Sequence, residues 1–171
     1  MQTIYTLTLL LFCTLTFAQT DRAINKIRKA VEQINKDTGY TTKTLDNEQF
    51  LEHMTDGGGK LTGYFKNGKL VKIVEWVGFS FCVNISEYYL KDNKLIFAYT
   101  QGSQFSYVDS LAGFDYDKLA LTMECRYYFE NGKMIKSILN GSTMCSGKPS
   151  DSWAKQYQDE CLRYLKLLKA K

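Results

Sequence analysis

Three copies of one short pattern constrain the fold of this 171-residue chain more than any other feature. Each copy has an aromatic residue, an apolar residue, a charged residue, a two-residue turn, Lys and two apolar residues. The copies are Tyr64–Val71, Tyr89–Ile96 and Tyr128–Ile135. Asn-Gly and, less favourably, Asp-Asn accept the positive φ angles of a type I′ turn, whose twist matches that of paired strands. The pattern therefore predicts three tight β-hairpins.

Side chains alternate across a strand, which assigns the hairpin residues to two faces. A two-residue loop would place Phe65 opposite Leu70 and Tyr64 opposite Val71. The first face is purely apolar and is expected to form the main core: Phe65, Leu70, Leu90, Leu95, Phe129 and Met134. The second face is amphipathic and is either half solvated or a shallow binding surface: Tyr64, Val71, Tyr89, Ile96, Tyr128 and Ile135. Because the copies are unevenly spaced, a curved antiparallel meander is expected rather than a solenoid.

Two amphipathic helices are predicted to flank this sheet. Asp21–Asp37 begins after the capping candidates Thr20 and Asp21, and its apolar residues recur at helical spacing: Ile24, Ile27, Val31 and Ile34. This stripe lacks Trp, Phe and Leu, so packing on the sheet is favoured over a membrane surface. Ser150–Lys169 carries a second stripe: Trp153, Tyr157, Cys161, Tyr164, Leu165 and Leu168. The predicted fold class is α+β.

Residues 1–18 predict export. Ile4–Phe17 is almost wholly apolar and uncharged, and Thr16-Phe17-Ala18 offers small residues where a signal peptidase reads. Cleavage before Gln19 would leave residues 19–171 as a single periplasmic or secreted domain without a transmembrane segment, because the apolar run is short for a bilayer. The alternative of a lipidated Cys13 is disfavoured because the preceding residue is Phe12.

Four cysteines remain after that cleavage: Cys82, Cys125, Cys145 and Cys161. An even number in an exported chain predicts disulfides, and four buried free thiols are the alternative. The expected pairs are Cys82–Cys125, since both fall on the Leu90 and Phe129 face, and Cys145–Cys161, since a loop cysteine precedes the last helix. No Cys-x-x-Cys pair is present, so no metal site is predicted.

The sequence assigns no catalytic residue and no cofactor. His53 is the one histidine, and no Gly-x-Ser-x-Gly motif accompanies it. The net charge of +4 is modest and no basic stripe alternates with aromatics, so a nucleic-acid partner is not expected. We expect a non-enzymatic domain that binds a protein or a small ligand, with Tyr64, Tyr89 and Tyr128 as candidate ligand-binding residues.

The alternative function is an exported hydrolase that uses the acids of residues 107–117, among them Asp115 and Asp117. A concave pocket with convergent acids and a raised carboxyl pKa would favour this hydrolase. A flat, Tyr-rich sheet face would favour binding.

The segments Tyr-Phe-Lys-Asn-Gly-Lys-Leu and Tyr-Phe-Glu-Asn-Gly-Lys-Met, at residues 64–70 and 128–134, resemble the hairpin unit of MORN-type repeats. They are most similar to the degenerate units of bacterial antitoxin-like and exported proteins. The chain lacks the second Gly pattern that closes a full MORN unit. The resemblance implies a β-hairpin array used for protein interaction, with no catalytic residues to carry over. The whole layout also looks like small exported bacterial domains of unknown function.

Overall fold

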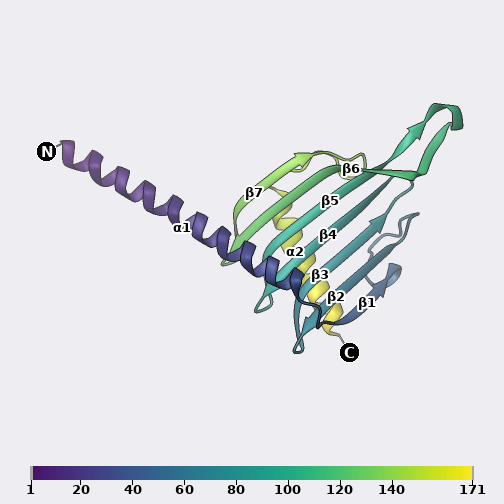
Figure 1. Cartoon of the computed structure of the whole chain (residues 1–171), viewed down its shortest axis with the longest axis horizontal. Helices are drawn as coiled ribbons and strands as arrows, with labels where there is room; N and C mark the ends of the chain where they lie inside the picture. Colours follow the sequence, from purple (N-terminus) through teal and green to yellow (C-terminus); the bar gives the residue numbers. More distant parts are fainter. Residues whose placement is uncertain (1, 171) are drawn as a thin grey trace.

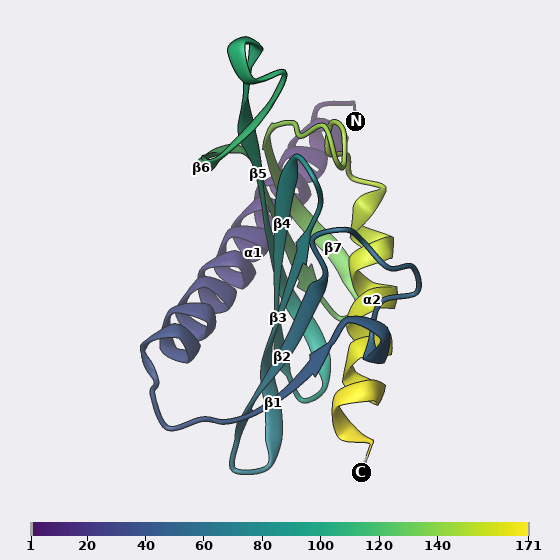
Figure 2. The ribbon, with the colours of Figure 1, turned by 90° about the vertical axis from the view of Figure 1, so that its right-hand side faces the viewer.

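One antiparallel sheet with a helix on each face makes up this protein. The computed structural model describes the backbone of residues 2–170 and the side chains of residues 19–110 and 112–170. Within these residues seven strands follow one another in the order β1-β2-β3-β4-β5-β6-β7. Helix α1 (Gln2–Lys36) and helix α2 (Trp153–Lys169) lie on opposite faces of the sheet (Figures 1 and 2). The α+β meander predicted from the sequence is confirmed.

The strands differ in length, and the two longest are neighbours. Two short 3-10 turns, Asn47–Gln49 and Asp109–Leu111, interrupt the connections. The strands are β1 Thr41–Asp46, β2 Gly59–Lys66, β3 Lys69–Gly78, β4 Cys82–Lys91, β5 Lys94–Val108, β6 Gly113–Glu130 and β7 Lys133–Gly141.

All three predicted hairpins are present, with one correction to their pairing. Asn67 and Gly68 have φ angles of 51° and 74°, as a type I′ turn requires. Phe65 lies opposite Leu70 as expected, but Tyr64 lies opposite Lys72 rather than Val71. The same one-residue shift follows the other two turns. Each is a β-bulge, which increases the right-handed twist of the ribbon.

The apolar face of the hairpins packs against α2 and forms the main core. Leu70, Leu90 and Phe129 are buried there, and Phe65, Leu95 and Met134 pack around them. The stripe of α2 enters the same cluster through Tyr157, Cys161, Tyr164 and Leu168. The predicted assignment of this face is therefore confirmed.

The other face of the sheet packs against α1. Ile24 and Ile27 contact a buried aromatic cluster of Tyr89, Phe97 and Tyr128. This confirms the predicted stripe and its packing on the sheet, but the helix does not begin at Asp21, because it already runs from Gln2. The predicted signal segment, including Cys13, has side chains outside the described residues. No helix in the described part of the chain is both long and apolar enough to cross a membrane.

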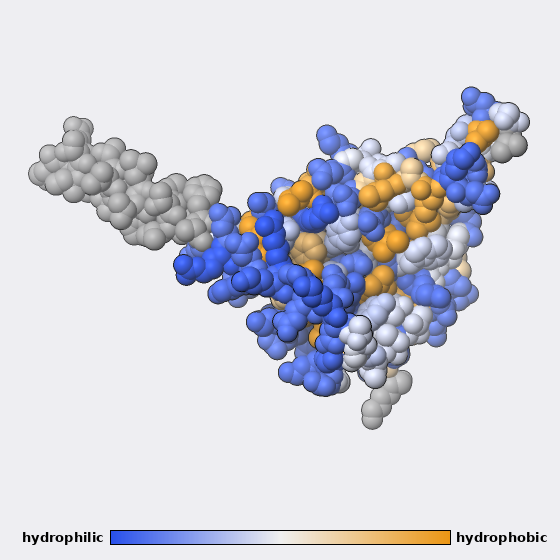
Figure 3. Space-filling model, in the orientation of Figure 1, coloured by the Kyte–Doolittle hydropathy of each residue, from blue (hydrophilic) through white to orange (hydrophobic). Residues whose placement is uncertain are grey.

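The end of the β5–β6 hairpin projects beyond the sheet as an arm (Figure 1). Gln104 is the last β5 residue paired with β4, and Met123 is the first β6 residue paired with β7. Between them the hairpin exposes large apolar side chains: Tyr107, Tyr116, Leu119 and Leu121. Apolar surface is visible on the arm and on the sheet beside it (Figure 3). Residues 107–117, which hold the acids of the alternative hydrolase function, thus form the tip of this hairpin.

Candidate functional site

The sheet face beneath α2 changes from apolar to polar along its length. Strand alternation places Tyr88, Ser86 and Asn84 on this face of β4, and Thr100 of β5 lies opposite Ser86. Ser86 and Thr100 are buried, and the Thr100 hydroxyl donates to Ser86 Oγ at 3.2 Å. These small polar side chains do not fill the space below the first turns of α2, so a cleft remains.

We call this space the α2 cleft. Its volume is about 380 Å³, within the range of small-molecule sites. Its floor comes from three strands, one wall comes from α2, and the remainder comes from two loops. The lining residues are Glu75, Val77, Asn84, Ser86 and Thr100 in the floor, Trp153, Gln156, Tyr157 and Glu160 in α2, and Phe79, Cys145 and Ser146 in the loops.

Two carboxyl groups meet in the α2 cleft, Glu75 from β3 and Glu160 from α2. Tyr164 Oη donates to Glu75 Oε1. Tyr88 Oη lies 2.7 Å from Glu160 Oε2 and 3.2 Å from Glu75 Oε2. A phenol has one hydrogen, which serves the shorter contact with Glu160. The Tyr88 contact with Glu75 is therefore the weaker of the two, and protonation of Glu75 would relieve the competition for this hydrogen.

The surroundings of Glu75 favour this protonated form. Burial raises the pKa of the Glu75 carboxyl to about 7, and the nearby charge of Glu160 adds to the increase. The hydrogen bonds from Tyr164 and Tyr88 and the charge of Arg163 act in the opposite direction on this pKa. Glu75 is therefore neutral in mildly acidic solution and ionises as the pH rises through neutrality.

The cations near this carboxyl pair are already engaged by other groups. Lys155 is paired with Asp159. Arg163 donates to the Phe50 carbonyl and to Tyr164 Oη, and its Nε lies 3.6 Å from Glu52. No Lys, Arg or His is among the residues that line the α2 cleft in the described part of the chain. Negative charge on Glu75 and Glu160 therefore has no partner within the cleft.

A wider depression continues from the cleft along α2. It has a volume of about 700 Å³ and shares the wall of Glu75 and Glu160. His53, the one histidine of the chain, lines this depression together with Glu52 and Thr55. The opening of the α2 cleft is thus charged, whereas its inner end is polar and aromatic.

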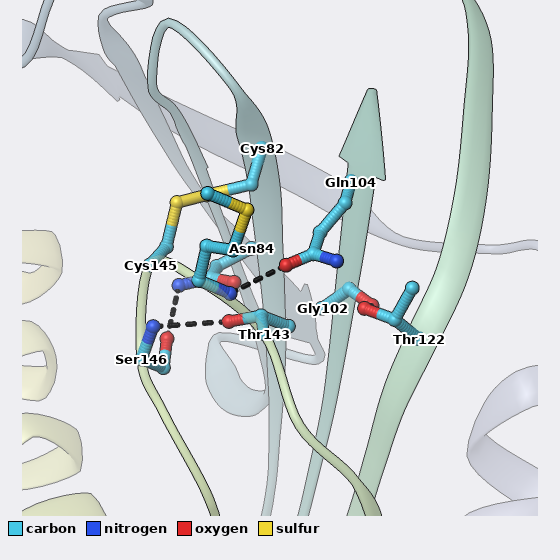
Figure 4. The surroundings of a disulfide bond; sticks show 9 residues. Cys82, Asn84, Gly102, Gln104, Thr122, Thr143, Cys145 and Ser146 are labelled. Atoms are coloured by element: carbon cyan, nitrogen blue, oxygen red, sulfur yellow. Dashed lines mark hydrogen bonds between the residues drawn. A yellow bond between two sulfur atoms is a disulfide. The ribbon is translucent and has the colours of Figure 1, made fainter. Parts of the chain in front are cut away.

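A disulfide closes the inner end of the cleft. Cys145 is bonded to Cys82 at the start of β4, with the two Cα atoms 6.4 Å apart. Asn84 Nδ2 donates to Ser146 Oγ at 2.7 Å, and the Ser146 amide donates to Thr143 Oγ1 at 2.9 Å (Figure 4). The disulfide and the Asn84 hydrogen bond hold the loop before α2 against β4.

The disulfide found here corrects both predicted pairs. Cys82 and Cys125 do share one face, but β5 lies between their strands. Cys125 is opposite Thr100 of β5, and Thr100 is opposite Ser86 of β4, which is four residues from Cys82. That offset is on the order of 15 Å, far beyond disulfide reach. Cys125 and Cys161 are buried free thiols in the main core. A Cys82–Cys145 disulfide fits a periplasmic or extracellular protein.

One acceptor at this end of the cleft lacks a donor. Asn84 Oδ1 is buried, and none of the described residues offers it a hydrogen bond. It lies 3.3 Å from the position that a Cβ on Gly102 would occupy. An unpaired buried acceptor costs free energy, so this oxygen is a destabilising feature of the inner end of the cleft.

The three candidate tyrosines lie on the opposite face of the sheet. Tyr89 and Tyr128 are buried under α1 and contact Phe97, with ring centroids 5.6 and 4.9 Å from it. Tyr64 is separate, and its ring makes an edge contact with Tyr40 at 6.0 Å. The Tyr89 hydroxyl donates to Asn35 in α1 at 3.0 Å. A ligand would reach Tyr89 and Tyr128 only after α1 had moved.

The acids proposed for hydrolysis lie on the arm rather than in the α2 cleft. Asp115 is 2.8 Å from Lys118 Nζ and also accepts the Asp117 amide. These two contacts lower the pKa of the Asp115 carboxyl. A general acid needs a raised pKa. The carboxyl with a raised pKa is that of Glu75 in the α2 cleft, not that of Asp115 on the arm.

Sequence reasoning did not single out Glu75, Glu160 or Asn84. One signal was available, because Asn84 and Ser86 share the face of Leu90 and interrupt an otherwise apolar row. Glu75 and Glu160 carry no such signal, since acids are common on strands and helices. Comparisons of the chain with protein-family models, with curated protein sequences and with solved structures found no match.

Proposed function

We propose that this protein is an exported, non-enzymatic domain that binds a small ligand in the α2 cleft. The observation that carries the proposal is the α2 cleft itself, a space of about 380 Å³ between helix and sheet. It combines aromatic walls with a few convergent polar groups, the composition typical of small-molecule sites. The disulfide anchors its inner loop, which reduces the entropy lost on binding.

The α2 cleft has the convergent acids and the raised carboxyl pKa that were expected to favour a hydrolase, but these acids are Glu75 and Glu160 rather than those of residues 107–117. Both Glu75 oxygens are occupied, by Tyr164 and by Tyr88. A general acid must present its proton to the substrate within hydrogen-bond reach. With both oxygens engaged, Glu75 is poorly placed to present a proton to a substrate, so we favour a pair of acids that attracts positive charge over one that transfers a proton.

The test is whether the cleft retains a ligand. We would purify the protein from its native envelope fraction, record native mass spectra, and screen small polar molecules by thermal shift. Ser86→Leu fills the cleft floor, and Thr62→Leu is a matched change on the α1-facing side of β2. We expect a bound small molecule that Ser86→Leu loses and Thr62→Leu keeps. A ligand held equally by both variants, or none in either assay, would refute the proposal.

A further inference from the structure

Two acids and no basic residue line the α2 cleft in the described part of the chain. Glu75 and Glu160 supply carboxylate oxygens, and Asn84 Oδ1 is an acceptor with no donor in the described chain. The Gln156 amide is already committed to Glu160 Oε1 at 3.0 Å. Lys155 is paired with Asp159, and Arg163 acts on Glu75 from outside the cleft lining, so a cationic ligand would meet two acids and no competing base there.

Aromatic rings form the remaining walls of this acidic space. Trp153 and Phe79 are half-buried and Tyr157 is buried, and all three line the cleft. Aromatic faces attract organic cations through their quadrupoles. Two carboxylates supply fewer oxygens than the six to eight that Ca²⁺ prefers, so the combination suits an organic ion better than a hard metal.

We infer that the α2 cleft takes a small protonated amine, whose N–H groups face the cleft side of Glu75 and Glu160 and whose carbon chain lies against Trp153 and Phe79. This inference rests on the proposed function and adds the chemical class of the ligand. The ammonium group supplies positive charge, which no residue that lines the cleft in the described part of the chain supplies.

Binding of an amine has to compete with the proton on Glu75. Only the ionised Glu75 attracts the cation fully, and its pKa is raised to about 7. Linkage then makes binding about tenfold weaker at pH 6 than at pH 8. The groups that face Glu75 are Tyr88 from β4, and Glu160, Arg163 and Tyr164 from α2. His53 lies in the adjoining depression and requires its own control.

The experiment uses Trp153 as the reporter. The chain has two tryptophans, and Trp76 faces away from α2, so a Trp76→Phe background leaves one Trp in the cleft. The probes are butylamine, 1-butanol and butyrate, which share a four-carbon chain and differ in charge. Ca²⁺ is the metal probe. Each is titrated against Trp153 emission at pH 6 and pH 8.

We expect butylamine to bind at least tenfold more tightly than 1-butanol, butyrate or Ca²⁺ at pH 8. Glu160→Gln and Glu75→Gln should each weaken this binding at least fivefold, and Glu75→Gln should also abolish its pH dependence. His53→Gln should leave the pH dependence intact. Thermal unfolding midpoints establish that each variant is folded.

The inference is overturned if butylamine binds no better than butyrate, or if Glu160→Gln has no effect on its affinity. Butanol or butyrate binding that is as tight as butylamine binding and that Ser86→Leu abolishes would overturn the amine inference and leave the proposed function standing. Failure of the proposed function is recognised separately, by the absence of any cleft-dependent ligand in native mass spectra and thermal-shift screens.

Discussion

Glu75 lies where the sheet face beneath α2 changes from apolar to polar. Ile73 precedes it on the same face and is fully buried, and Ser86 is its partner on β4. Removing a carboxyl group from water is costly unless the group is neutral or paired. Protonation and two tyrosine hydroxyls reduce that cost for Glu75. A single residue thus gives the cleft its sensitivity to pH.

This arrangement predicts a pH-dependent stability that Glu75→Gln removes. A carboxyl whose pKa is higher in the folded chain makes stability fall as the pH rises from 4.5 to about 7. Glutamine imitates the neutral carboxyl, accepting from Tyr164 and donating to Tyr88. At pH 8 the variant should be more stable than the natural chain by on the order of 2–3 kcal/mol, and at pH 4.5 the two should agree.

The measurement is urea unfolding from pH 4.5 to pH 8. Glu48→Gln, at an exposed site, is the matched control and should follow the natural chain at every pH. A Glu75→Gln variant less stable than the natural chain at pH 8 would show that Glu75 is held as a carboxylate.

At the scale of elements, the three hairpins are built alike but turn with different residues. Gly68 and Gly132 have φ angles of 74° and 75°, while Asn93 occupies the matching position of the β4–β5 turn at 60°. Nothing lies within 4 Å of a Cβ added at Gly68 or Gly132. Substitution there tests backbone conformation alone, without a steric clash.

We expect Gly68→Ala and Gly132→Ala each to lower the free energy of unfolding by about 1 kcal/mol, because L-residues are strained at positive φ. Asn93→Gly should raise it by up to about 1 kcal/mol for the same reason. Equilibrium denaturation of the three variants is the test. A stabilising Gly68→Ala would contradict the type I′ turn.

At the scale of the whole molecule, the Cys82–Cys145 disulfide joins the sheet to the segment that leads into α2. It spans 63 residues, including β4 through β7. In the chain-entropy model a loop of this length contributes about 4 kcal/mol. Cys145→Ser should therefore unfold at much lower urea, and reduction of the natural chain should have a comparable effect. Cys125→Ala and Cys161→Ala are the comparison variants, because each removes one buried free thiol and leaves the Cys82–Cys145 disulfide in place.

Peptide mapping under non-reducing conditions checks the connectivity directly. We expect one linked peptide pair containing Cys82 and Cys145, and alkylation of Cys125 and Cys161 only after unfolding. A linked peptide containing Cys161 would require a different docking of α2.

The predicted export signal also has consequences for the whole chain. The first buried residues described in α1 are Ala23 and Ile24, so cleavage before Gln19 would spare the contacts of α1 with the sheet. We therefore expect a mature chain that begins at Gln19 and retains full stability. Intact mass of protein from the envelope fraction is the measurement, and a full-length chain in the cytosol would contradict export.

Local patterns were sufficient for most of the fold. Turn residues with positive φ located the hairpins, alternation assigned Leu70, Leu90 and Phe129 to the core face, and helical spacing identified the stripes of α1 and α2. These features depend on neighbours within a few residues, which the sequence displays directly.

The bulges, the disulfide and the α2 cleft required the tertiary structure. Alternation fixes the face of a side chain but not its offset along neighbouring strands, so Cys82 and Cys125 share a face without meeting. Glu75 and Glu160 meet because α2 crosses the sheet above β3 and β4. That crossing also buries Glu75. No local sequence pattern predicts this burial, because the distance between a helix and a sheet depends on how the whole core packs.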